Sequence, residues 1–481
     1  MPGSFGYALH YLIEHELDLS YFDEYYCNDS TGAPAFDPRV MLKIILYAYA
    51  HGMISSRDIS WCCDHNILFM ALSADSHPHF TTIASFVRRH ESAILRLFRD
   101  IVVICDGYGL IGQEMFALDG CKLASNASKE WSGTMNDFER KLQKVENALH
   151  NLLQKHQEQD QKESDQDPEV RAYEEQYVAS LQAQTKKLKE WIAAHDDRRS
   201  RAGNVVKSNL TDNESAKMTT SHGVIQGYVG AAVVDEKNQV VVNAEAFGEA
   251  QENHLLQPMI EGVYSLFSGS SDDVFANTQF SADSGFHTEQ NMRYLAEKGI
   301  DAYVADNKFR TRDERFDSAV RHKPKEKRPV GRFTPADFIL DQTNLTCICP
   351  AGHRLYLKNR RVKLDHYFTL RFQAPKTDCI SCSLRSKCLR SVDQKTSRQV
   401  NFIYGDALGE PETYTQKMKR KIDTDYGRAM YARRLSTVEP VFTNIRWNKG
   451  LSHFTLRGTK KVTTQWRLFC MVHNIEKINR Y

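Results

Sequence analysis

Residues 279–304 read QFSADSGFHTEQNMRYLAEKGIDAYV and predict a strand, a helix and a second strand. The first strand is short and ends in the carboxylate of Asp283. Helical periodicity covers residues 288–298, Gly299 ends the helix, and residues 300–304 again have strand character.

Two further strand signals lie upstream of this unit. A hairpin is predicted with strands at residues 227–234 and 239–244 around an Asp-Glu-Lys-Asn turn. The apolar residues 114–119 predict another strand, which ends in the carboxylate of Asp119 before Gly120. A hairpin followed by a strand, a helix and a strand indicates a mixed sheet covered by helices, and therefore an α/β fold.

The composition is that of an ordinary globular protein. The chain has 481 residues, 41% hydrophobic and 26% charged, which excludes collagen-like and fully disordered classes. Lys and Arg total 63 against 61 Asp and Glu, so net charge does not indicate a nucleic-acid partner. No apolar run reaches the roughly 18 residues of a membrane span, and no signal peptide is recognisable at the start. We therefore expect a cytosolic protein whose 11 cysteines are free thiols or metal ligands.

The first 105 residues have the pattern of several short helices. Pro38 stands just inside the start of one of them, and residues 81–90 form another that carries Arg88 and Arg89. This layout resembles a helix-turn-helix arrangement, which predicts contact between the two arginines and DNA. The alternative is a small helical bundle whose arginines form a solvated face.

Residues 131–199 have apolar residues at alternating spacings of four and three. They predict two antiparallel helices joined by a polar tip at residues 157–169. Such a hairpin is an oligomerisation or DNA-gripping arm, or a self-packed insertion in a loop; the second interpretation is favoured.

Residues 307–410 combine a basic segment with a group of cysteines. Ten Lys or Arg and four acids lie within residues 308–332, which fits either phosphate contact or a solvated loop. Cysteines in two turns about 30 residues apart suit a tetrahedral Zn²⁺ site in a small ribbon, with Cys349, Cys379, Cys382 and Cys388 as ligands. The alternative is a set of ordinary buried thiols.

Three carboxylates far apart in the sequence suggest metal chemistry. Asp119 and Asp283 each end a predicted strand, and two such ends converge at one edge of a sheet. Glu439 lies in the late helical region. Mg²⁺ prefers a few carboxylate oxygens and suits phosphate chemistry, so the three residues predict a phosphodiester-cleaving site.

Three segments in order carry a family resemblance: FALDGCK at 116–122, ADSGF at 282–286 and YARRLSTVEPVFTNIR at 431–446. With them the chain resembles the DDE transposases of bacterial insertion sequences. The last segment is similar to the Tyr–Arg–Glu–Lys signature of one group of these enzymes. Tyr431, Arg434 and Glu439 match it with one extra residue before the glutamate, and Arg446 takes the lysine position.

The resemblance covers most of the chain. Residues 36–89 resemble the helical N-terminal domain of these proteins, residues 226–235 the strand pair after the first aspartate, and residues 444–478 the C-terminal helical closure. It implies an RNase H-like fold, a Mg²⁺- or Mn²⁺-dependent triad and cut-and-paste transposition. The implied partners are double-stranded element ends, target DNA and a second protomer, in a bacterial cytoplasm at the nucleoid.

The resemblance also implies residue roles. Asp119 and Asp283 would hold the metal and Glu439 would complete the site, while DNA contacts are expected from Arg88, Arg89, Tyr431, Arg434, Arg446 and Lys449. Offsets of −5 and +7 are taken to place Arg434 and Arg446 on the helical face of Glu439, with ion pairs to nearby acids as the alternative. Pro440 predicts a helix start or a kink that re-aims Glu439.

The predicted organisation follows from these segments. A DNA-binding helical domain covers 1–105, the catalytic core covers 106–130 and 200–306, the helical hairpin covers 131–199, the basic and Cys-rich zinc-ribbon-like insertion covers 307–410, and a C-terminal helical part of the core covers 411–481. The rival functions are an inactive transposase derivative that only binds DNA and an RNase H-like nuclease without strand transfer. No P-loop or dinucleotide motif is present, so no nucleotide cofactor is expected.

Overall fold

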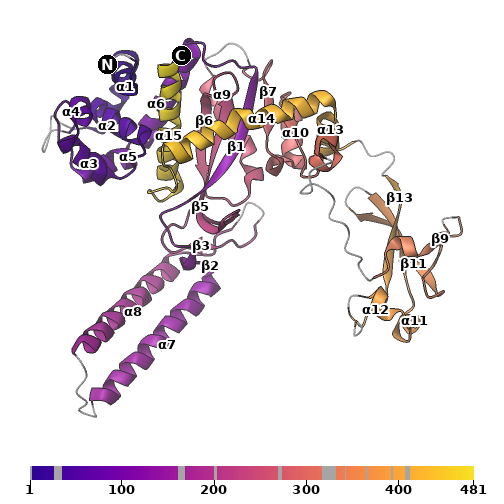
Figure 1. The fold of residues 1–481 in the computed structure, drawn as a ribbon. Coiled ribbons are helices and arrows are strands. Elements are labelled where there is room, and N and C mark those ends of the chain that lie inside the picture. Colours follow the sequence, from indigo (N-terminus) through magenta and orange to yellow (C-terminus); the bar gives the residue numbers. More distant parts are fainter. Residues whose placement is uncertain are drawn as a thin grey trace. The chain divides into compact units, whose positions relative to one another are not determined.

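The computed structural model (Figure 1) describes residues 3–26, 35–160, 168–199, 203–268, 273–316, 332–341, 343–364, 367–389, 391, 394–406 and 412–481. The chain forms two compact units. The first consists of Met1–Asn307 and Met418–Tyr481, and the second of Lys308–Lys417.

A six-stranded mixed sheet forms the centre of the first unit. Its strands are β1 (Met115–Ala124), β4 (Ala216–Thr220), β5 (Gly223–Asp235), β6 (Val241–Phe247), β7 (Gln279–Ala282) and β8 (Asp301–Val304). Their order is β4-β5-β1-β7-β8, and β6 also pairs with β5. The β1, β5 and β6 pairings are antiparallel, whereas β1, β7 and β8 run parallel. The predicted hairpin and the strand–helix–strand unit are confirmed, and the fold is mixed α/β.

The middle strands are buried on both faces, which explains their continuous apolar runs. Residues 226–235 of β5 are buried throughout. Asp235 is the last residue of β5. Its carboxylate accepts hydrogen bonds from the backbone N–H groups of Gly112 and Gln113 at 3.1 and 3.0 Å, which tie the end of the strand to the segment before β1. Helices cover the sheet: α9 (Leu256–Leu266) packs on β5 and β6, and α10 (Glu289–Glu297) connects β7 to β8.

Helices of the N-terminal region pack on the last helix of the chain. Those that contact it are α1 (Phe5–Tyr11), α2 (Pro38–Ala50), α5 (Phe80–Arg89) and α6 (Glu91–Gly107). Helices α3 (Ser56–His65) and α4 (Ile67–Ser73) pack on α2 and on each other. The C-terminal helix α15 (Thr459–Arg480) lies between these helices and β6 (Figure 1). Tyr49 stacks on Phe469 with ring centroids 4.5 Å apart. Trp466 donates its indole N–H to the carbonyl of Ala231 at 2.8 Å, so α15 joins the helical region to the sheet.

The predicted helical hairpin is present as α7 (Met135–Asp160) and α8 (Pro168–Ala194), which lie side by side. Phe138, Leu188 and Trp191 form its small buried core. The short strands β2 (Ser132–Gly133) and β3 (Ser208–Asn209) pair at its base. Residues 161–167 of the predicted polar tip lie outside the described residues.

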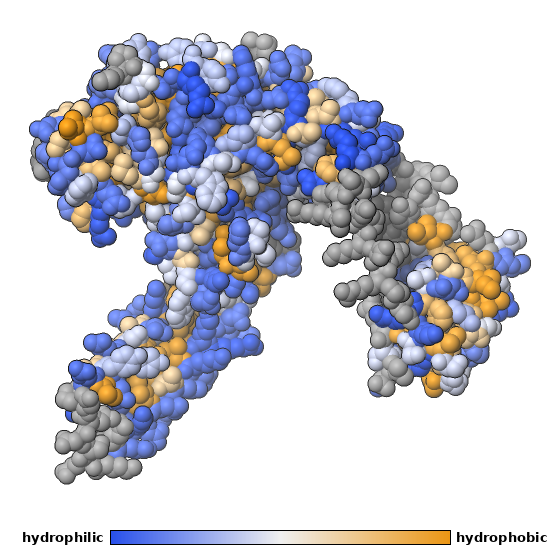
Figure 2. All heavy atoms as spheres, viewed as in Figure 1, coloured by the Kyte–Doolittle hydropathy of each residue, from blue (hydrophilic) through white to orange (hydrophobic). Residues whose placement is uncertain are grey.

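The second unit has a five-stranded antiparallel sheet of its own. Its strands are β9 (Ile339–Asp341), β10 (Thr346–Ile348), β11 (Arg354–Leu364), β12 (Tyr367–Gln373) and β13 (Gln399–Asp406), and it also has the short helices α11 (Lys376–Ile380) and α12 (Arg385–Cys388). Phe338, Leu355 and Phe372 belong to its core. Apolar side chains also reach its surface (Figure 2), among them Ile380, 71% exposed. Most of the predicted basic loop, residues 317–331, lies outside the described residues.

Three helical elements connect back to the sheet of the first unit. Helix α13 (Tyr414–Ile422) is followed by α14 (Asp425–Thr443), which contacts β1, β7 and β8 and continues into a π-helical turn, Asn444–Asn448. Pro440 lies inside α14, so the predicted helix start at this residue is wrong. Whether it re-aims Glu439 stays a hypothesis.

A buried histidine of α15 makes the packing of this helix on the rest of the first unit sensitive to acid. His473 hydrogen-bonds the carbonyl of Gln239 at 2.9 Å and the side-chain amide of Asn444 at 3.0 Å. Burial lowers the pKa of His473 from 6.5 to about 3, opposed by the Gln239 carbonyl. The neutral ring therefore belongs to the folded protein, whereas the unfolded chain takes up a proton near pH 6.5.

Acid should therefore unfold the protein in part through His473. Because its pKa is depressed on folding, its contribution is complete above pH 6.5 and declines as pH falls toward 3. At a rate of about 1.4 kcal/mol per pH unit, pH 5 should cost about 2 kcal/mol of unfolding free energy. Urea unfolding of wild type and His473→Gln between pH 7 and pH 5 measures the difference, and equal slopes with pH would contradict it.

Within the described part of the chain, no helix combines the length and apolar character needed to cross a membrane.

Candidate functional site

Asp119 and Asp283 stand next to each other on two parallel strands. The register pairs Leu118 of β1 with Ala282 of β7, and each aspartate is the next residue. Neighbouring residues in register on parallel strands direct their side chains to the same face of a sheet. The two carboxylates therefore share one face, as their contacts below confirm.

Asp283 follows the last residue of β7, as predicted, but Asp119 does not end its strand. The prediction for Asp119 is wrong because β1 continues to Ala124 along β5, with Gly120 opposite Ala231. Only the pairing with β7 stops at Leu118. From Asp119 to Leu123 the only strand partner of β1 among the described residues is β5, and Ala124 then also bridges His453. The edge of β1 beside Asp119 is therefore not covered by β7.

Arg434 of α14 joins the two aspartates. Its Nη1 donates to Asp119 Oδ2 at 2.6 Å and its Nη2 to Asp283 Oδ1 at 3.3 Å, and only 6% of its side chain is exposed. Tyr431, one helical turn earlier, donates its hydroxyl to Asp283 Oδ1 at 3.4 Å. Of the two interpretations of Arg434, a DNA contact or an ion pair with nearby acids, the structure contains the ion pair.

Burial has the largest effect on the pKa of Asp119. It raises the pKa of Asp119 to about 6, against the opposing effects of the Arg434 guanidinium and the Gly120 N–H; the carboxylate of Asp283 raises it further. Asp119 accepts the Gly120 N–H at 2.8 Å. Two neighbouring carboxylates repel each other, so the site favours a cation between them, a place now held by the guanidinium.

Glu439 lies on another face of α14 than Arg434. It is exposed and lines a groove of about 660 Å³ together with Cys121, Lys122 and Arg446. Five residues turn a helix by about 500°, so Arg434 lies about 140° from Glu439, and the prediction that they share a face is wrong. Arg446, seven residues on, does share the groove with Glu439.

A second acid of the groove, Glu252, was not predicted as a site residue. Its Oε1 is 3.5 Å from Lys122 Nζ, and burial raises its pKa while Lys122 lowers it and Asp283 raises it. A Cβ on Gly285 would come within 3.2 Å of Glu252 Oε2, so the glutamate lies against the turn after Asp283. Lys122 belongs to the segment quoted for the resemblance, but no spacing pointed to Glu252.

Two segments of the chain match known family models. Residues 348–479, which include Glu439, match the family described as Transposase DDE domain. Residues 2–89 match the family described as Transposase domain (DUF772). The two matches support an insertion-sequence DDE transposase. No curated protein matches the chain. Transposases act on DNA, and their DDE families generally use a divalent metal.

The other predicted DNA-contact residues differ in accessibility. Arg88 and Arg89 are exposed at the end of α5, and Arg446 is exposed beside Trp447. Lys449 is 1% exposed and its ammonium pairs with Glu476, so the prediction of a phosphate contact for Lys449 does not fit the structure. Burial lowers the pKa of Lys449, and Glu476 opposes this shift.

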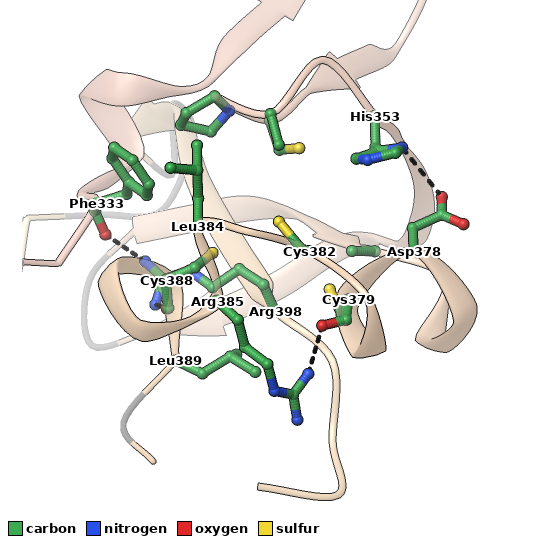
Figure 3. Close-up of a pocket in the computed structure, with 14 residues that line it drawn as sticks. Phe333, His353, Asp378, Cys379, Cys382, Leu384, Arg385, Cys388, Leu389 and Arg398 are labelled. Carbon is green, nitrogen blue, oxygen red and sulfur yellow. Dashed lines mark hydrogen bonds and ion pairs between the residues drawn. The ribbon is translucent and has the colours of Figure 1, made fainter. Parts of the chain in front are cut away.

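The four cysteines predicted to bind zinc line one pocket of the second unit (Figure 3). Cys349 begins a tight turn in which the Gly352 N–H donates to its carbonyl at 2.8 Å. Cys379 belongs to α11, Cys382 follows it, and Cys388 ends α12. Burial raises the pKa of the Cys388 thiol, Arg398 lowers it, and the other three cysteines add to the rise, so each of the three lies close enough to interact with Cys388.

The side chains predicted to bind metal are of the types that each predicted metal prefers. Paired carboxylate oxygens suit Mg²⁺ or Mn²⁺, and four thiols suit Zn²⁺. Yet no group of three or more His, Cys, Asp or Glu side chains among the described residues is arranged to hold a metal ion. In the first unit the reason is visible, because Arg434 holds the two aspartates and Glu439 lies on another face of α14.

Proposed function

We propose that the transposase binds the ends of its insertion sequence and catalyses divalent-metal-dependent DNA cleavage and strand transfer. The observation that carries this proposal is the pair of aspartates in register on β1 and β7, bridged by a buried cation. An RNase H-like core is part of the proposal. It is supported by antiparallel β1, β5 and β6 followed by parallel β7 and β8, with the acidic pair at the junction.

Asp119 and Asp283 would hold Mg²⁺ or Mn²⁺, with Glu439 as the third carboxylate. When bound, the metal supplies the positive charge that activates a water or a 3′-hydroxyl and stabilises the leaving oxygen. Glu439 forms no hydrogen bond or ion pair within the described part of the chain, so its carboxylate is available for this role.

The arginines near the aspartates would contact phosphate groups of the DNA. Arg446 is exposed in the groove, where its guanidinium can donate two parallel hydrogen bonds to a phosphate of the bound strand. In the absence of a metal ion, Arg434 would offset the charge of the two aspartates and orient them, and it can turn one N–H group toward the scissile phosphate. Tyr431 would hold Asp283 in place through its hydroxyl.

The N-terminal helices and a second protomer would bind DNA away from the cleaved phosphodiester. Arg88 and Arg89, exposed on α5, would contact the element end as part of a DNA-binding helical domain. A homodimer, which brings two element ends together, is part of the proposal, as is action on the bacterial chromosome.

Purified protein, Mg²⁺ and labelled duplex carrying the element ends test the proposal. We expect nicking at the element end followed by joining of its 3′-hydroxyl to a target plasmid. A mobility shift without nicking would reduce the protein to a DNA binder. Nicking without joined product would identify a nuclease.

We also propose that Cys349, Cys379, Cys382 and Cys388 bind a structural Zn²⁺ in a zinc-ribbon-like unit. Their support is the shared pocket between two turns, in a unit whose hydrophobic core is small. Metal analysis should find about one zinc per chain, lost in a Cys379→Ser/Cys382→Ser double variant. The matched control is Cys347→Ser, since Cys347 is buried nearby but does not line the pocket. Zinc-free protein whose second unit resists proteolysis would contradict the proposal.

A further inference from the structure

A second pocket, of about 580 Å³, lies at the base of the helical hairpin, and four Lys or Arg residues are part of its lining. Arg198 and Arg199 follow α8, Lys207 precedes β3, and Lys217 lies on the edge strand β4. The acid in its lining is Glu249. None of the functional roles assigned above uses this pocket.

The charge of the pocket is poorly compensated within the described residues. Arg198 donates to the carbonyls of Asn213, Ser215 and Gly248, all at 2.8 Å, so neutral groups fix its guanidinium. Arg199 donates to the carbonyl of Gly203 at 3.0 Å. Neither Lys207 nor Lys217 forms an ion pair among the described side chains.

One carboxylate outside the lining, that of Asp137, lies near the pocket. Asp137, which interacts with Lys207 electrostatically, accepts hydrogen bonds from the backbone and hydroxyl of Thr134 at 3.0 and 3.1 Å. Lys141 of α7 lies near Glu130 and Asp137 and also adds a positive charge near Lys217. A pocket with this excess of positive charge attracts an anion, and a flexible chain of phosphates fits it best.

The pocket adjoins the groove of Glu439 along two shared segments. On β4, Lys217 lines the pocket and Thr219 lines the groove, and residues two apart lie on the same face of a strand about 7 Å from each other. In the loop before α9, Gln251 lines the pocket and Glu252 lines the groove. A strand that passes Glu439 therefore meets Lys217 within a few nucleotides.

We propose that the pocket formed by Arg199, Lys207 and Lys217 binds phosphates of the DNA strand that leaves the groove of Glu439. This inference rests on the proposed function, because it assigns a path to DNA whose reactive phosphodiester lies in that groove. The pocket would recognise the charge of the DNA backbone and not the base sequence, since Arg199, Lys207 and Lys217 are cations that bind phosphate.

The test is a Lys207→Gln/Lys217→Gln double variant, with Lys144→Gln/Lys187→Gln on the exposed faces of α7 and α8 as the control. Affinity for wild-type element-end duplex is measured against salt, with duplexes that extend past the cleavage point or stop at it. For the extended duplex, the pocket variant should bind about tenfold more weakly, and the slope of log affinity against log salt should fall by about two. The control and the truncated duplex should show neither change.

Other outcomes are distinguishable. Equal losses with extended and truncated duplexes would show a general charge effect and overturn the pocket assignment, as would an unchanged pocket variant. If either of these occurs while wild type still nicks and joins DNA, the proposed function stands without the pocket. If wild type binds no duplex, both proposals fail. Matching circular dichroism spectra of the two double variants exclude misfolding as the cause.

Discussion

Replacing Asp283 with asparagine should abolish DNA cleavage while DNA binding remains within about twofold of wild type. The amide keeps the size of the side chain but removes the charge that would hold a divalent cation beside Asp119. Charge stabilisation by such a cation contributes several kcal/mol, and each 1.36 kcal/mol is tenfold in rate, so the loss should exceed about 10³-fold. Nicking of element-end duplex under single-turnover conditions measures it.

Asp301→Asn is the matched control for this substitution. Asp301 lies in the same sheet, but opposite Gln279 at the far end of the β7–β8 pair, and it pairs with Lys421. Its amide variant should cleave at nearly the wild-type rate. Strong cleavage by Asp283→Asn, or an equal loss in both variants, would refute the assignment of Asp283.

Replacing Arg434 with alanine should both destabilise the protein and stop cleavage. It leaves two adjacent carboxylates without the guanidinium that neutralises them, 2.6 Å from Asp119 and 3.3 Å from Asp283. A fully buried pair would cost roughly 3–5 kcal/mol, but Asp283 is 37% exposed, so we expect about 2 kcal/mol in urea unfolding. In the same variant without DNA, Mn²⁺ should bind more tightly, because the competing cation has gone.

A second background separates the ion pair from simple loss of packing. In an Asp119→Asn/Asp283→Asn protein, Arg434→Ala should cost much less unfolding free energy, because no carboxylate remains to be neutralised. An equal cost in both backgrounds would show that Arg434 acts through packing alone. Weaker Mn²⁺ binding by Arg434→Ala would contradict the view that the guanidinium takes the place of the metal.

The sequence predicted the elements that local patterns determine. The hairpin of β5 and β6, the β7–α10–β8 unit and the α7–α8 pair follow from periodicity and turn residues. The proximity of Asp119 and Asp283 also followed, although for a partly wrong reason. The dipeptide Asp119-Gly120 predicts the end of a strand, whereas β1 continues along β5 past Asp119.

The sequence could not predict which contacts the side chains would make. Lys449 looked like another basic residue of a DNA-binding segment, yet tertiary packing buries it against Glu476. Glu252 has no motif of its own, and only the fold brings it beside Lys122 and the turn after Asp283. The direction of Arg434 was misjudged because a five-residue offset was treated as one face of a helix.

Iron-mediated protein cleavage tests the central claim that Asp119, Asp283 and Glu439 share one metal site. Fe²⁺ replaces Mg²⁺ in the complex with element-end DNA, and peroxide then cuts the polypeptide next to the bound ion. We predict cuts next to Asp119 in β1, next to Asp283 after β7 and next to Glu439 in α14, all lost in Asp283→Asn. Cuts confined to other segments, or cuts at the aspartates with none beside Glu439, would contradict the account.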